Sequence, residues 1–92
     1  MRAYVRFRTD PGRTRMIAEE VLAGMPEVVS LYRTGEDHAL FSDVFVGDLG
    51  SLDGFLKRVF GVDGITDTVT TIVIERRKEA RVPESVLSRS RG

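Results

Sequence analysis

The chain opens with a segment in which apolar and polar positions alternate. Tyr4, Arg6 and Arg8 fall on one side of this segment, and Ala3, Val5 and Phe7 fall on the other. A period of two is typical of a β-strand with one buried face. Stretches rich in Val, Ile, Thr and Phe predict further strands over residues 28–34, 39–46 and 66–75.

Two other segments repeat apolar residues at helical spacing. The first helix is expected to start at Asp10 and Pro11, because aspartate caps free amides and proline fits a first helical turn. Gly24 and Pro26 end it. The second helix is expected to begin after Asp48, again as the cap. The apolar stripes are Met16, Ile17, Val21, Leu22 and Met25 in the first helix, and Leu49, Leu52, Phe55, Leu56, Val59 and Phe60 in the second.

The order of these elements is strand, helix, strand, strand, helix, strand. This βαββαβ order predicts an α+β protein with the ferredoxin-like arrangement. A length of 92 residues allows one domain with a small core. We expect residues 1–76 to form that domain and residues 77–92 to be a basic, partly mobile extension, since six basic and two acidic residues follow residue 75.

The third and fourth predicted strands carry large apolar side chains on both faces. Phe41 and Phe45 project to one side of the third strand, and Leu40 and Val44 to the other. A sheet with helices on only one side should be polar on its other face. We therefore expect the uncovered face to pack against a second copy of the chain. The alternative is that the C-terminal segment folds back over it.

Charge and composition exclude several classes of function. The chain has 14 basic and 14 acidic residues, so no overall field attracts nucleic acid or a membrane surface. With no cysteine and one histidine, disulfides, thiolate catalysis and a multi-histidine metal site within one chain are excluded. We expect no cofactor and no metal. Charges interrupt every apolar run, so neither a signal peptide nor a membrane span is expected, and the predicted location is the cytoplasm.

The turn between the second and third strands is the first candidate site. Gly35 permits a positive φ that exposes backbone amides, and Glu36, Asp37 and His38 add two carboxylates and an imidazole. Such a turn could hold a zwitterionic small molecule, with amides on its carboxylate and acidic side chains on its ammonium. From the residues alone an ordinary solvated hairpin tip is favoured. No nucleophile with an orienting partner accompanies His38, so catalysis is not supported.

A pair of threonines in the fourth strand is the second candidate site. Thr68 and Thr70 are two positions apart, so their hydroxyls share one face of the sheet. Paired hydroxyls can bind the polar end of a ligand. Threonine is also simply a good strand former, which is the favoured interpretation.

Several short stretches, in this order and spacing, resemble the effector-binding domain of the Lrp/AsnC (leucine-responsive and asparagine-operon) regulators, also called the regulation-of-amino-acid-metabolism domain. The similarity runs from about Ala3 to Arg76. It is most specific at residues 26–29, 35–36, 48–56 and 64–73.

The resemblance implies a ferredoxin-like fold whose sheets pair into a dimeric α/β barrel, with dimers often joined into larger rings. It implies a non-enzymatic, oligomeric sensor that binds an amino acid or a related metabolite between dimers. Carried onto this sequence, the ligand-binding residues are Gly35, Glu36, Asp37, His38, Thr68 and Thr70.

The sequence departs from the family in two respects. The usual turn reads glycine, acid, aromatic, aspartate, whereas here Asp37 is at the aromatic position and His38 at the aspartate position. The first strand begins at Met1, so we expect no helix-turn-helix and no direct contact with nucleic acid. The expected partners are further copies of this chain, an amino-acid effector and full-length Lrp/AsnC relatives joined by mixed assembly.

Two other functions remain open from the sequence. Dimeric α/β-barrel monooxygenases share this sheet, but they need polar catalytic groups between helices and sheet, where the predicted inward residues are apolar. A purely structural assembly partner without a ligand is the other alternative.

Overall fold

The computed structural model describes residues 1–75 and 77 of the chain. The extension predicted over residues 77–92 therefore lies outside the described residues, apart from Arg77, and so does the alternative that it folds over the sheet. The elements in chain order are β1 (Arg2–Thr9), α1 (Thr14–Met16), η1 (Ile17–Val21), η2 (Leu22–Gly24), β2 (Val28–Arg33), β3 (Ala39–Phe45), α2 (Leu49–Phe60) and β4 (Ile65–Ile72).

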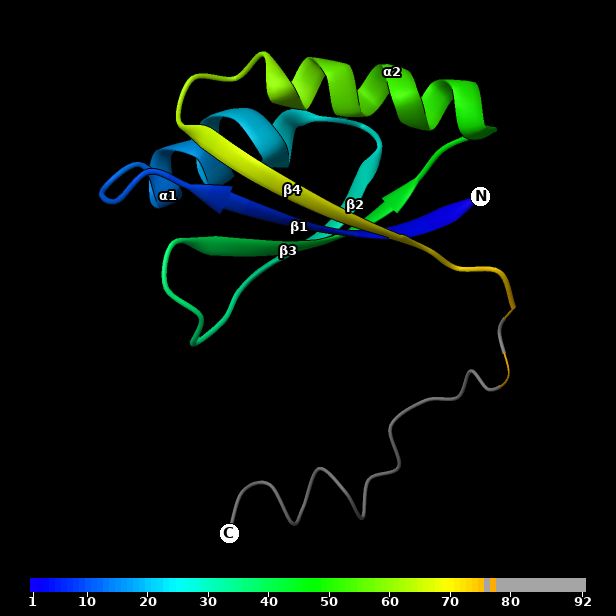
Figure 1. Cartoon of the computed structure of the whole chain (residues 1–92), viewed down its shortest axis with the longest axis horizontal. Coiled ribbons are helices and arrows are strands. Elements are labelled where there is room, and N and C mark those ends of the chain that lie inside the picture. Colours follow the sequence, from blue (N-terminus) through cyan, green and yellow to red (C-terminus); the bar gives the residue numbers. More distant parts are fainter. Residues whose placement is uncertain (76, 78–92) are drawn as a thin grey trace, which may run out of the picture.

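The four strands form one antiparallel sheet with the order β2-β3-β1-β4. The helical segments after β1 and after β3 both lie on the same side of it (Figure 1). This is the βαββαβ arrangement that the sequence predicts, and the ferredoxin-like fold is confirmed. The ends of the strands differ slightly from expectation, most at β4, which ends at Ile72 rather than at residue 75.

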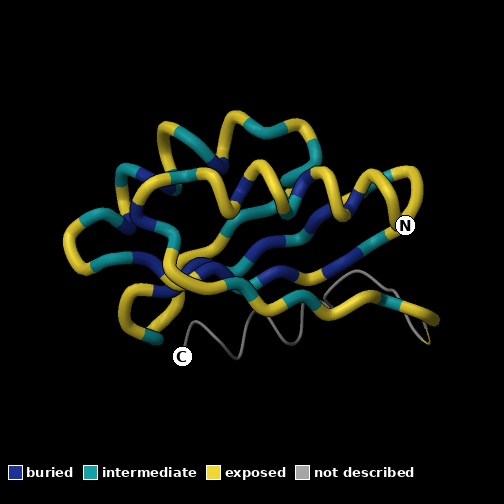
Figure 2. The backbone as a smooth tube through the Cα atoms, turned by 45° about the horizontal axis from the view of Figure 1, so that its top comes forward, coloured by how far each residue is buried: buried dark blue, intermediate teal, exposed yellow. Residues whose placement is uncertain are grey.

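The hydrophobic core lies between the sheet and the helices (Figure 2). The predicted alternation of β1 is confirmed, because Ala3, Val5 and Phe7 are buried and at most 1% exposed. From α2, Phe55 and Val59 pack against them with no exposed surface. The strand pattern thus determines which face of the sheet receives the helices.

The first helical segment differs from its prediction at its start. Asp10 does not cap it. The backbone N–H of Arg13 donates to the Asp10 carbonyl at 3.1 Å, and Gly12 turns the chain at φ 82°. The helix begins only at Thr14, with no side-chain cap. Pro11 consequently belongs to this turn and not to a first helical turn.

The rest of that segment is helical but irregular. One α-helical turn passes into the π-helical η1 and then the 3-10 helical η2. Ile17 and Leu22 are buried as the stripe predicts. None of the helices among the described residues is long and apolar enough to cross a membrane.

The second helix begins as predicted. The backbone N–H of Ser51 donates to Asp48 Oδ1 at 2.7 Å, so Asp48 caps α2. Three of the six residues in the expected stripe are buried: Leu52, Phe55 and Val59. The two ends of the stripe are not, since Leu49 is 61% exposed and Phe60 58% exposed.

The Asp48 cap gives a pH-dependent prediction. The hydrogen bond from the Ser51 N–H lowers the pKa of Asp48 below its ordinary value. A carboxylate with a lower pKa in the folded state stabilises the fold above about pH 4 and loses that contribution as pH falls through the folded pKa. In Asp48→Asn the cap remains and the titration is removed. We expect the urea midpoints of the natural chain and the variant to converge as pH falls below the folded-state pKa of Asp48. A difference that does not change with pH would contradict this assignment.

Candidate ligand-binding site

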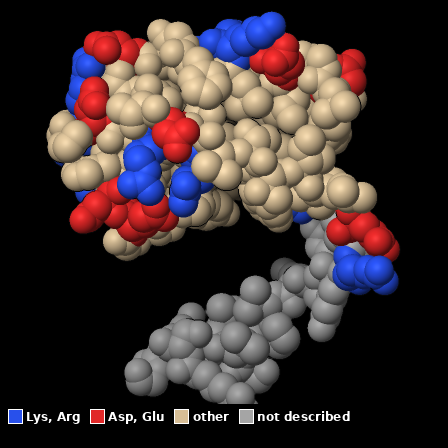
Figure 3. Space-filling view, in the orientation of Figure 1, with Lys and Arg blue, Asp and Glu red and all other residues tan. Residues whose placement is uncertain are grey.

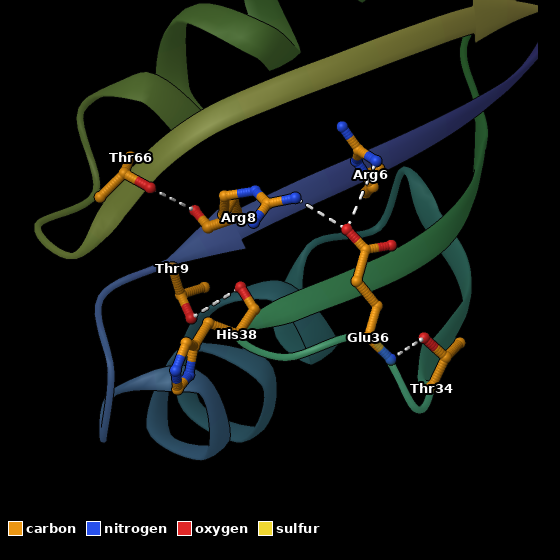
Figure 4. A network of polar contacts seen from close by, with 7 residues as sticks. All are labelled: Arg6, Arg8, Thr9, Thr34, Glu36, His38 and Thr66. Carbon is orange, nitrogen blue, oxygen red and sulfur yellow. Dashed lines mark hydrogen bonds and ion pairs between the residues drawn. The ribbon is translucent and has the colours of Figure 1, made fainter.

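The predicted ligand turn, residues 35–38, lies beside the end of β1 (Figure 4). Glu36 Oε1 accepts hydrogen bonds from Arg8 Nη2 at 2.8 Å and from Arg6 Nη1 at 3.4 Å. The Glu36 amide donates to Thr34 Oγ1 at 3.3 Å. The first acid of the turn is therefore already engaged by two arginines on the uncovered face of the sheet.

The backbone of the turn takes a left-handed conformation at a residue that we did not expect. The positive φ predicted for Gly35 occurs instead at His38, with φ 56°. The N–H of Thr9 donates to the His38 carbonyl at 2.8 Å, directly after the last β1–β3 pair. Glycine at position 35 is thus not required by the backbone, while His38 holds a conformation that side chains disfavour.

Asp37 is the acid of this turn that remains available. Its side chain is exposed and forms no ion pair within the described part of the chain. Figure 3 shows acidic and basic side chains gathered over this end of the sheet. A carboxylate in such a position can accept a hydrogen bond from an ammonium group.

The two candidate threonines lie on the other side of the sheet from Glu36. Thr68 is opposite Phe7 and Thr70 opposite Val5 in the β1–β4 register. Phe7 and Val5 face the helices, so both threonines face them too and are partly buried. They share a face, as predicted. Within one protomer the structure does not bring them together with the Glu36 carboxylate.

The loop between α2 and β4 lies at the same end of the sheet as the candidate turn. Its contacts with the segment after β1 were not predicted from the sequence. Arg13 Nη1 donates to Asp63 Oδ2 at 2.7 Å, which lowers the pKa of Asp63 and raises that of Arg13. The Asp10 N–H donates to the Gly64 carbonyl at 2.8 Å. Gly64 has φ 99°, and a Cβ there would lie 3.0 Å from Ile17 Cδ1. Nothing local in the sequence signals these contacts.

The uncovered face of the sheet carries the large apolar side chains that we expected. Tyr4, Tyr32, Phe45 and Val69 are between 43% and 58% exposed. A hollow of about 560 Å³ lies on this face, lined in part by Tyr4, Tyr32 and Val69.

An ion pair stands within this apolar surface. Arg2 Nε and Nη2 donate to the two Asp43 oxygens at 2.8 and 2.5 Å, and the Arg2 guanidinium lies over the Tyr4 and Phe45 rings at 5.2 and 5.5 Å. The charges of Arg2 and Asp43 thereby compensate each other within this face.

The described interior offers little for acid–base chemistry. Its buried polar residues carry hydroxyls, those of Thr9, Thr14 and Ser42. The carboxylate of Glu27 is partly buried and is paired with Arg58 of α2. Ser42 Oγ donates to the Val5 carbonyl at 2.9 Å, and the two threonines bond to each other. Among the described residues no group of three potential metal ligands occurs.

Comparison with known proteins agrees with the fold and with the motifs. The family model for the Lrp/AsnC ligand binding domain matches residues 2–83. Uncharacterized HTH-type transcriptional regulators of Pyrococcus abyssi and Pyrococcus horikoshii are 35% and 34% identical over 77 residues. Each match covers 83% of this chain and 48% of the relative, so the chain spans about half the length of these proteins.

Solved structures share the fold. A hypothetical protein from Pyrococcus horikoshii superposes with a TM-score of 0.72 at 28% identity, covering 83% of this chain and 92% of that one. A Neisseria meningitidis transcriptional regulator in complex with L-Met gives a TM-score of 0.79 at 22% identity, covering 94% and 58%. Since the family model spans most of the sequence and the fold agrees, the chain belongs to the Lrp/AsnC family and carries its ligand-binding domain.

Proposed function

We propose that this domain is a non-enzymatic, oligomeric sensor that binds an amino acid or a related small metabolite and modulates transcriptional regulators through its assembly. Membership of the Lrp/AsnC family supports the regulatory role. The Neisseria regulator of the same fold was solved with L-Met, which supports an amino acid as the class of ligand.

The observation that carries the ligand site is the difference between the two acids of the turn. Glu36 is neutralised by Arg6 and Arg8, whereas Asp37 is exposed and has no ionic partner among the described residues. We assign the contact with the ligand's ammonium to Asp37. It takes the role of the aspartate that the family usually has one position later, where this chain has His38.

The uncovered sheet face is the proposed surface for a second copy. Its exposed Tyr, Phe and Val side chains would leave water in a face-to-face pair, and burial of apolar area drives such association. The Arg2–Asp43 pair is satisfied within one chain, so it enters the interface without an unpaired charge.

No observation on the described residues favours the monooxygenase-like alternative. An enzyme of that kind needs polar catalytic groups between helices and sheet. The buried side chains described there are apolar or are hydroxyls bonded within the protein, and the partly buried Glu27 carboxylate is paired with Arg58. We therefore treat the domain as a binding module.

The ligand assignment predicts a selective loss of binding in Asp37→Asn. A thermal-shift screen of the twenty amino acids at millimolar concentration should raise the melting temperature of the natural chain with at least one. In Asp37→Asn that ligand should bind about tenfold more weakly or worse, because a charge-assisted hydrogen bond is lost. The 2-oxo acid with the same side chain lacks the ammonium and should bind the natural chain as weakly as the amino acid binds the variant.

Asp53→Asn is the matched control, because Asp53 is an exposed carboxylate of α2 paired only with Lys57. It should bind as the natural chain does. If no amino acid shifts the melting temperature, the sensor proposal is wrong. If Asp37→Asn binds normally, the ligand lies elsewhere.

A further inference from the structure

Thr9 connects the candidate ligand turn to the first helix. It is the last residue of β1 and only 3% exposed. Its N–H and its Oγ1 both contact the His38 carbonyl, at 2.8 and 3.3 Å (Figure 4). Its Oγ1 also lies 2.7 Å from Thr14 Oγ1, and Thr14 is the first residue of α1 and 6% exposed.

The hydroxyl protons give these contacts a direction. Each threonine hydroxyl has one proton to donate and can accept as well. If Thr9 Oγ1 donates to the His38 carbonyl, its hydrogen bond with Thr14 must take the proton of Thr14. The result is a series of hydrogen bonds in which the Thr14 hydroxyl donates to Thr9 and the Thr9 hydroxyl donates to the His38 carbonyl. Both hydroxyls are then satisfied, as buried polar groups must be.

This series of hydrogen bonds ends at His38, the residue of the turn with the least favourable backbone conformation. A residue with a Cβ avoids a φ of 56°, so His38 keeps this conformation only where surrounding contacts determine it. Two donors from Thr9 converge on its carbonyl. The Thr9 contacts are therefore well placed to hold the turn in its present shape.

Polar contacts hold the turn at the two residues next to Asp37, one on each side of it. On the uncovered face the Glu36 carboxylate is held by Arg6 and Arg8. On the side of the helix the His38 carbonyl is held by Thr9. Asp37 lies between these two anchors in the sequence. Its backbone direction is thus set from both neighbours.

We infer that Thr9 is a positioning residue for Asp37, and that its hydroxyl couples the conformation of the ligand turn to the start of α1 through Thr14. The coupling gives a change in the turn a physical route to the irregular helical segment α1–η1. This inference rests on the proposed function for its ligand and on the described contacts for its geometry.

The test uses the full chain with Thr9→Val, which keeps the backbone N–H and the branched shape but removes the hydroxyl. We expect exchange of the amide hydrogen at position 9, which bonds to the His38 carbonyl, to accelerate severalfold, and the NMR signals of Thr14 to shift. The amino acid found by thermal shift should bind about tenfold more weakly, as for the loss of one buried hydrogen bond that orders a site. Thr9→Ser restores the hydroxyl and should restore both exchange and affinity.

Thr66→Val is the matched control, because Thr66 Oγ1 makes one exposed hydrogen bond to the Arg8 carbonyl at 3.3 Å. It should leave the turn and the affinity unchanged. Should Thr9→Val fail to fold, Thr14→Val removes only the outer donor and must still accelerate exchange of the Thr9 amide hydrogen. The inference is overturned if the variant that folds leaves exchange of the position 9 amide hydrogen unchanged, or if Thr9→Ser behaves as Thr9→Val does.

The same measurements separate this inference from the proposed function. If the natural chain binds no amino acid, the sensor proposal fails, and exchange of the amide hydrogen at position 9 still decides whether the Thr9 hydroxyl holds the turn. If an amino acid binds and Thr9→Val binds it equally well, the sensor proposal stands and the positioning role is refuted.

Discussion

Val69→Lys is expected to convert an oligomer of this chain into a monomer. Val69 is 45% exposed on the uncovered face of β4, directly opposite Arg6 in the β1–β4 register. A lysine there has a like charge beside it, and a face-to-face pair would bury that ammonium in an apolar interface. Removing an unpaired charge from water costs several kcal/mol, on the order of 3–5, and a symmetric pair contains two such charges.

Light scattering at micromolar concentration measures this effect. The natural chain should have at least the mass of a dimer, and Val69→Lys the mass of one chain with an unchanged circular dichroism spectrum. Phe60→Lys is the control, because Phe60 is 58% exposed and lies on α2, away from the uncovered face. A natural chain that is monomeric, or dissociation caused by Phe60→Lys instead, would show that the sheet face is not the surface of association.

The fold could be predicted largely from local patterns. Alternation in β1 and the Asp48 cap of α2 depend on neighbouring residues, and both are found as predicted. The start of the first helix could not be predicted in this way. Asp10 lies in a turn that comes before the helix, and its N–H bonds to the carbonyl of Gly64, more than fifty residues later. A capping preference describes a helix end in isolation and does not include such tertiary contacts.

The ion pairs of the candidate site could not be predicted from local patterns either. The two acids of the turn, Glu36 and Asp37, could be identified from the sequence, but nothing in the sequence distinguished one from the other. Their difference depends on the β1–β3 register, which brings Arg6 and Arg8 next to Glu36 and leaves Asp37 exposed. On the other side of the turn the His38 carbonyl is bonded by Thr9, which also comes from β1. These pairings are long-range, and no period in the sequence encodes them.

Phe55→Ala, in the apolar stripe of α2, is expected to lower the free energy of unfolding strongly. Phe55 has no exposed surface and packs in the core against β1, so its removal leaves a cavity that the neighbouring side chains fill only in part. Substitutions of this kind cost about 3–5 kcal/mol. A domain of this length has a total stability of about 5–14 kcal/mol, so the variant loses a large fraction of it.

Phe60→Ala separates this loss from the effect of helix composition. Both residues belong to the stripe predicted for α2, and both substitutions introduce the same residue, but Phe60 is 58% exposed. We expect its free energy of unfolding to change by no more than about 0.5 kcal/mol. Urea unfolding at one fixed protein concentration compares the two variants, because an oligomer's stability depends on concentration. Similar losses in both would mean that Phe60 is covered in solution, which would place part of the subunit contact on the outer side of α2 and not on the sheet.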